Sequence, residues 1–170
     1  MISYLKDKYY WYNINQRLKK FLKGNEEQKI LMYGYPKSGN TWLRFLLYNY
    51  RELLINPGNL ETITYDRLNS IQNNIMDEGT TFVAEDGFPI FYRTHVGYNT
   101  SYTLFDKKVF IHRNPLDTLI SSYYFYRNRK VPFCDDIIAF REKLSDIDYY
   151  VVYKIDGWID FYKESIHNAD

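Results

Sequence analysis

An apolar run followed by a short turn occupies residues 29–42, in the order Lys-Ile-Leu-Met-Tyr-Gly-Tyr-Pro-Lys-Ser-Gly-Asn-Thr-Trp. The run predicts a strand, Lys29–Tyr35, and the residues after the turn predict a helix, Asn40–Leu54. The first N–H groups of a helix have no partner inside it, and the helix dipole favours negative charge there. With the charge of Lys37 added, this unit indicates a site for a phosphate or similar oxyanion. The helix is expected to bury one stripe, made of Trp42, Phe45, Leu46, Asn49 and Leu53.

A second strand-and-turn segment follows later in the chain. Lys107–His112 predicts a short buried strand, and a helix is expected from Pro115 to about Tyr126. Asn114 is a good N-cap, and proline suits the first helical position. At the turn, Arg113 can offer a two-pronged set of donors to a phosphate. The helix is expected to bury an apolar stripe that leaves Ser121 to one side and comprises Leu116, Leu119, Ile120, Tyr123 and Tyr124.

The remaining chain alternates predicted helices with one further strand. The strand is residues 89–94, and the other predicted elements are helices over 3–23, 65–76, 135–144 and 151–165, with a short helix or loop over 99–105. Strands separated by helices predict a parallel α/β sheet, in which ligands bind outside the carboxyl ends of the strands. Both turns follow such an end, so we expect them to face one ligand. No linker divides the chain, which predicts a single domain over residues 1–170, with a core over 29–128 and a helical C-terminal part over 133–166.

Composition excludes several classes of protein. A net charge of +1 argues against a nucleic-acid binder, which would be strongly basic. The single cysteine, Cys134, excludes an internal disulfide and fits a reducing compartment. No signal peptide and no membrane-spanning stretch are visible, so a cytoplasmic location is expected. The 19 tyrosines and 11 phenylalanines could line a half-wet acceptor cleft, or reflect a compositional bias without a function.

The turn at residues 36–42 is not a Walker A loop, because its lysine precedes Gly39 instead of following the second glycine. The order Pro-Lys-Ser-Gly-Asn-Thr-Trp resembles the 5′-phosphosulfate loop of the sulfotransferase family, which uses 3′-phosphoadenosine 5′-phosphosulfate (PAPS). Arg113 with a serine eight residues later, Ser121, resembles the family's 3′-phosphate segment. The resemblance implies a three-layer, P-loop-like α/β fold, PAPS as sulfuryl donor and no metal.

The resemblance also implies roles for individual residues. Lys37 would stabilise the leaving oxygen, or serve only as an electrostatic contact to the phosphate. Trp42 would stack on the adenine, or pack within the helix core. Asn40 stands where many members have threonine and keeps a hydrogen-bonding side chain. The implied cofactor-binding set is Lys37, Ser38, Gly39, Asn40, Thr41, Trp42, Arg113 and Ser121.

The candidate catalytic base is His95, which ends the strand over residues 89–94. Its segment resembles the family's strand-Lys-Thr-His motif, with Arg93 in place of the lysine. A positioned base with a pKa near neutrality adds roughly 10²–10⁴-fold to the rate. Glu85 is the alternative base, or else a solvated loop acid. The other two histidines are expected in a strand and in the C-terminal tail, at His112 and His167.

The likeness weakens after residue 126, and the fold is expected to be C-terminally short. Family members continue with a further strand and a Gly-rich basic segment over the 3′ phosphate, and nothing in this sequence matches either. The leading hypothesis is a sulfotransferase acting on a hydroxyl or amine of a small molecule or glycan. The alternative is a truncated, non-catalytic module that binds PAPS or its product PAP, and a kinase-like enzyme is a weaker third. An incomplete sheet would expose an edge for pairing with a second copy, giving a homo-oligomer.

Overall fold

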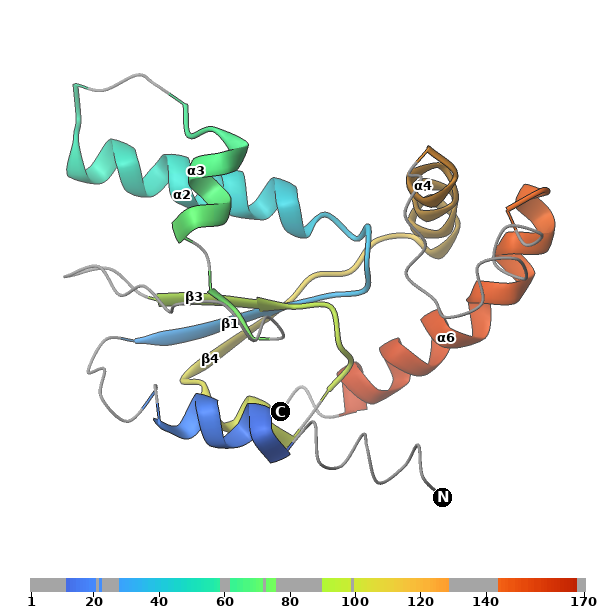
Figure 1. The fold of residues 1–170 in the computed structure, drawn as a ribbon, viewed down its shortest axis with the longest axis horizontal. Coiled ribbons are helices and arrows are strands. Elements are labelled where there is room, and N and C mark those ends of the chain that lie inside the picture. The colour runs from blue at the N-terminus through green and yellow to red at the C-terminus, as the bar shows by residue number, and fades with distance from the viewer. Residues whose placement is uncertain are drawn as a thin grey trace. The chain divides into compact units, whose positions relative to one another are not determined.

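The computed structural model describes residues 12–20, 22, 28–58, 62–71, 73–75, 90–98, 100–128 and 144–167 (Figure 1). Its contacts divide the chain into two compact units, each built from separate stretches of sequence. We call the first the sheet unit, composed of Met1–Tyr33, Thr41–Thr94 and Asn99–Val109. The second is the turn unit, composed of Gly34–Asn40, His95–Tyr98 and Phe110–Asp170.

The sheet has the strand order β2-β3-β1-β4. Strand β1 (Lys29–Tyr33) runs parallel to β3 (Ile90–Thr94), and the two pair over their full lengths. The short strand β2 (Asn73–Asn74) is parallel to β3 on its other side, and β4 (Lys107–Phe110) neighbours β1. The prediction of a parallel α/β sheet is therefore confirmed.

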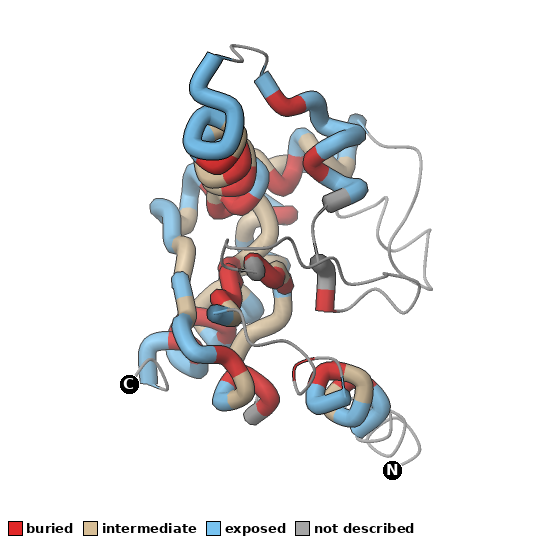
Figure 2. Tube along the Cα trace, turned by 90° about the vertical axis from the view of Figure 1, so that its left-hand side faces the viewer, coloured by how far each residue is buried: buried red, intermediate tan, exposed pale blue. Residues whose placement is uncertain are grey.

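Helices cover both faces of this sheet, as Figure 1 shows. Helices α2 (Asn40–Ile55) and α3 (Tyr65–Ile71) lie over one face. Helical residues 12–20 lie over the other face. The buried side chains here are apolar and four residues apart: Ile14, Leu18 and Leu22. This spacing confirms the amphipathic helix predicted at the N-terminus wherever it is described. Buried residues alternate with exposed ones along the helices (Figure 2).

The predicted buried stripe of α2 is wrong at three of its five residues. Trp42 is 70% exposed, and Leu46 and Leu53 are also exposed. The face turned inward instead carries two arginines and a tyrosine at helical spacing, Arg44, Tyr48 and Arg51. Large apolar side chains surround this helix, so periodicity alone could not select a face. Arginine can take an inward position because its long stem is apolar.

Three other predicted boundaries differ from the structure. The helix predicted over residues 65–76 ends at Ile71, because Asn73–Asn74 pair with β3 and the amide of Ile75 donates to the carbonyl of Arg93 at 3.2 Å. Two asparagines carry no strand signal of their own, so only this pairing makes them a strand. Strands β1 and β4 each end two residues earlier than predicted. Where a short helix or loop was expected over residues 99–105, the structure has a short 3₁₀ helix, η1 (Thr100–Leu104).

Helices α4 (Pro115–Asn128) and α6 (Ile147–His167) pack against each other in the turn unit. The buried residues of α4 are Thr118, Leu119, Ser122 and Tyr123. The predicted stripe of α4 is therefore right for only two of its five residues, Leu119 and Tyr123, since the other three are exposed. Small polar residues at the helix contact explain the difference: the hydroxyls of Ser122 and Tyr150 lie 2.8 Å apart and satisfy each other inside it.

Helix α6 is longer than predicted. It begins at Ile147, after Asp146, whose side chain accepts a hydrogen bond from the amide of Tyr149 at 2.9 Å, and it continues through Gly157. His167, expected in a tail, is its last residue. The helix predicted over 135–144 lies outside the described residues. Within the described parts of the chain, no helix is both long and apolar enough to cross a membrane.

Candidate functional site

The turn after β1 has an unusual backbone. Lys37 has a φ of 73° and Gly39 a φ of 111°, both in the left-handed region. A non-glycine residue there costs about 1–2 kcal/mol, and such strain gathers at functional sites. Between them, the amide of Ser38 donates to the carbonyl of Tyr35 at 3.1 Å, which closes the turn.

Two side chains of this turn suit an anion. The ammonium of Lys37 lies 4.3 Å from the centre of the Phe125 ring of α4, a cation–π contact that holds the charge near the turn. The side chain of Ser38 is buried, and its hydroxyl oxygen has no hydrogen-bond partner among the described residues. Buried hydroxyls are normally satisfied, so the oxygen of a bound ligand fits this position.

His95 lies directly against the same turn. Its Nδ1 atom is 3.0 Å from the carbonyl oxygen of Gly34 and 2.9 Å from the side-chain nitrogen of Asn40. The same Asn40 nitrogen is 3.3 Å from the Gly34 carbonyl. The buried asparagine therefore lies against both the histidine ring and the carbonyl of Gly34, a contact that the sequence did not reveal. His95 itself is exposed, so its ring also reaches solvent.

The two contacts at Nδ1 of His95 require different tautomers. A bond to the Gly34 carbonyl needs a proton on Nδ1, whereas a bond from the Asn40 amide needs Nδ1 to accept. With the proton on Nδ1, the other ring nitrogen, Nε2, is a base. The carbonyl of Gly34 is thus the group that would prepare His95 to take a proton.

The two predicted phosphate turns meet at Gly34. A Cβ atom placed on Gly34 would lie only 2.5 Å from the carbonyl oxygen of Ile111 and 3.2 Å from its Cβ. Ile111 stands two residues before Arg113. Gly34, at the start of the first turn, and the turn before α4 are therefore in backbone contact, as one shared ligand would need.

The second turn has the predicted cap. The side-chain oxygen of Asn114 accepts a hydrogen bond from the amide of Leu116 at 2.9 Å, and α4 starts at Pro115. Because this side chain occupies the helix terminus, a phosphate would be held by other groups. Arg113 is available for this: its Nε is 3.8 Å from the carboxylate of Asp117, and both side chains are exposed. Ser121 lies half-buried, two turns into α4.

The turn unit thus contains most of the predicted site: Lys37, Ser38, Gly39, Asn40, His95, Arg113 and Ser121. Thr41 and Trp42 belong to the sheet unit, in the first turn of α2. The exposure of Trp42 shows that the core-packing alternative is wrong, and its stacking on adenine stays a prediction. Glu85 lies outside the described residues. His112, expected in a strand, follows the end of β4 and is exposed.

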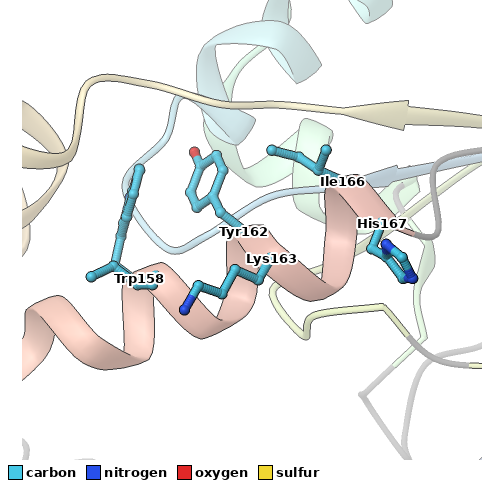
Figure 3. Close-up of a pocket in the computed structure, with 6 residues that line it drawn as sticks. Trp158, Tyr162, Lys163, Ile166 and His167 are labelled. Carbon is cyan, nitrogen blue, oxygen red and sulfur yellow. The ribbon is translucent and has the colours of Figure 1, made fainter.

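The sequence missed several neighbours of the site. The amide of Arg113 donates to the hydroxyl of Tyr162 on α6 at 3.2 Å. Tyr162 also stacks on Trp158 with ring centres 4.0 Å apart, and both border an open, mainly apolar groove of about 580 Å³ along α6 (Figure 3). No residue predicted to bind the cofactor lines this groove. In the described parts of the chain, no cluster of three or more His, Cys, Asp or Glu side chains is placed to hold a metal.

The contact at Gly34 gives a testable prediction. The Gly34→Ala variant should lose about 1–3 kcal/mol of unfolding free energy, the usual cost of overpacking, because its methyl group meets the backbone of Ile111. Gly58→Ala is the matched control, since nothing lies within 4 Å of the added Cβ. Urea unfolding followed by circular dichroism compares the two variants. Equal stability of the two would contradict the close approach of the turns.

Comparison with known proteins gives a consistent result. A model of the sulfotransferase domain matches residues 27–164. Cytosolic sulfotransferase 3 of Arabidopsis thaliana is 26% identical over 122 residues, which cover 68% of this chain and 36% of that protein. Sulfotransferase 2A1 of Homo sapiens is 26% identical over 112 residues, which cover 61% of this chain and 37% of that protein. The chain therefore spans little more than a third of these relatives' length. No solved structure matches it significantly.

Proposed function

Because the chain belongs to the sulfotransferase domain family, we propose that it transfers a sulfuryl group from PAPS to a hydroxyl or amine of a small-molecule or glycan acceptor. One observation carries the proposal: Gly34 joins the two phosphate turns and the candidate base. Its backbone touches Ile111 before the second turn, and its carbonyl lies 3.0 Å from the ring of His95. The turn unit could then both bind the donor phosphates and take up the proton of the acceptor.

The donor would be bound by both turns. Lys37 supplies a positive charge to the 5′ phosphosulfate, and the buried hydroxyl of Ser38 supplies a hydrogen bond. Gly39 and the start of α2, Asn40 and Thr41, offer backbone amides, because the side-chain nitrogen of Asn40 is engaged with the carbonyl of Gly34. The 3′ phosphate would be held at the second turn and the adenine by Trp42, whose indole is exposed. The residues that would hold the 3′ phosphate are Arg113, in the second turn, and Ser121, within α4.

The reaction needs one proton acceptor and one stabiliser of negative charge. The acceptor oxygen or nitrogen forms a bond to sulfur, the bond from sulfur to the bridging phosphate oxygen breaks, and the acceptor proton passes to Nε2 of His95. The Gly34 carbonyl holds the proton on Nδ1 and so keeps Nε2 basic. Lys37, now beside Phe125, stabilises the charge that grows on the leaving oxygen. No step in this scheme calls for a metal.

Calorimetry in EDTA tests donor binding. We expect PAP to bind without metal, and Arg113→Ala to weaken binding by about 1.5–3 kcal/mol, roughly 10- to 150-fold, through loss of a charge-assisted hydrogen bond. Binding of adenosine 5′-phosphosulfate, which lacks the 3′ phosphate, should hardly change. Arg127→Ala, at the exposed far end of the same helix, is the control. Binding that appears only with Mg²⁺ would instead favour a kinase-like enzyme.

Transfer of ³⁵S from PAPS to a mixed acceptor panel tests the role of His95. His95→Ala should lower kcat by roughly 10²-fold or more and leave PAP affinity intact, because a base acts in the transition state. Lys37→Ala should lower both kcat and the affinity for PAP, since its charge also stabilises the bound donor. His112→Ala, which alters another exposed histidine, is the control. Full kcat in His95→Ala would contradict its role as the base and make Glu85 the next candidate. If the wild type binds PAP but shows no turnover, the non-catalytic alternative is supported.

A further inference from the structure

The exposed side of helix α2 is apolar. Between residues 42 and 54, every exposed side chain of this helix is apolar or aromatic: Trp42, Leu46, Tyr50, Leu53 and Leu54. The last four, which are 46% to 58% exposed, form what we call the outer face of α2, together with the half-buried Leu43 and Leu47 beside them. The inner side of the same helix carries Arg44 and Arg51, so the usual polarity of a surface helix is reversed.

The outer face of α2 is large enough to be an interaction surface. Counting roughly 200 Å² for a fully exposed side chain of this size, its members offer about 500 Å² of accessible surface. Apolar patches of more than a few hundred Å² are rare on monomeric proteins and mark interaction sites. Two such faces packed together bury about 1,000 Å², the lower bound for a specific interface. Trp42 is not counted, because the proposed function assigns its ring to the adenine.

The chemistry of this face fits a second copy of the chain. Interfaces between identical subunits are more apolar than those between separate proteins, and a face without charge meets no like charge on its own copy. A lipid surface fits less well, because helices that lie on membranes carry exposed Lys and Arg beside their apolar side. The arginines of α2 are buried instead, and the guanidinium of Arg51 lies 2.8 Å from the carboxylate of Glu52.

The edges of the sheet are poorer surfaces for self-association, although the sequence predicted pairing there. Natural edge strands avoid pairing with other chains by being very short or by carrying lysine. The described sheet has both devices, since β2 at one edge is only two residues long and β4 at the other begins with Lys107 and Lys108. The outer face of α2 is therefore the stronger candidate.

We propose that the chain forms a homodimer in which the outer faces of α2 from two copies pack antiparallel across a twofold axis. Twofold symmetry sets one surface against itself and is the commonest symmetry of protein oligomers. Leu46, Tyr50 and Leu54 form one ridge with a spacing of four residues, the row by which helices most often interlock. Because Tyr50 is midway along this ridge, an axis near it sets Leu46 of one copy against Leu54 of the other.

Sedimentation velocity of the full chain, over a series of micromolar concentrations, tests the dimer. The wild type should dimerise with a dissociation constant in the micromolar range, as expected for a small interface. Leu46→Glu combined with Leu54→Glu should weaken dimerisation by roughly 100-fold or more, because each copy brings two charges into an apolar contact. Val152→Glu, which alters an exposed apolar residue of α6, is the matched control and should leave the dimer intact.

A second pair of substitutions separates a lost contact from a misfolded chain. Leu46→Lys combined with Leu54→Lys should also give a monomer. An equimolar mixture of the glutamate and lysine variants should then form a heterodimer, because opposite charges face each other across the axis. Misfolded chains would not regain an interface on mixing.

A wild type that stays monomeric would overturn the proposal, and so would a dimer that survives either double substitution or a mixture that stays monomeric. A dimer that Val109→Lys abolishes and the α2 variants retain would overturn it in favour of the β4 edge. Binding of a monomeric wild type to vesicles of phosphatidylcholine and phosphatidylserine would overturn it in favour of a lipid surface. None of these outcomes depends on whether the protein transfers sulfate.

Discussion

The close backbone contact between Gly34 and Ile111 is the constraint on which the candidate site depends. Only a residue without a side chain fits there, because a Cβ would meet the Ile111 carbonyl at 2.5 Å. Gly34 follows β1 and starts the first turn, and its carbonyl also faces Asn40 and His95. One residue thereby couples three parts of the turn unit that are distant in sequence. A substitution at this position should disturb the two phosphate turns and the base together.

Charged side chains differ in burial between the two units. In the two turns, Lys37 is half-buried and Arg113 is exposed, so a nucleotide can reach both positive charges. Arg44 in the sheet unit is almost completely buried, and its guanidinium stays charged beside Arg93. Exposed cations bind an anion with little desolvation cost, whereas a buried one is stabilised mainly by the anion that neutralises it.

Local signals in the sequence were sufficient for part of the structure. Both strand–turn–helix segments and the Asn114 cap were predicted correctly, since each rests on neighbouring residues. The cap at Asp146 carried the same kind of signal and was overlooked. What failed depended on tertiary contacts: β2 is a strand only by pairing, and the inner face of α2 is set by packing. No local pattern could show that Asn40 would hold a histidine 55 residues away.

Hydrogen–deuterium exchange with and without PAP, in EDTA, tests most directly whether the two turns bind one nucleotide. The account predicts slower exchange at residues 34–42 and 111–121 together, because a single ligand with phosphates at its 5′ and 3′ positions orders both turns. Exchange over residues 12–20, on the opposite face of the sheet unit from α2 and α3, should stay unchanged. Protection of only one turn, or of neither at saturating PAP, would contradict the account.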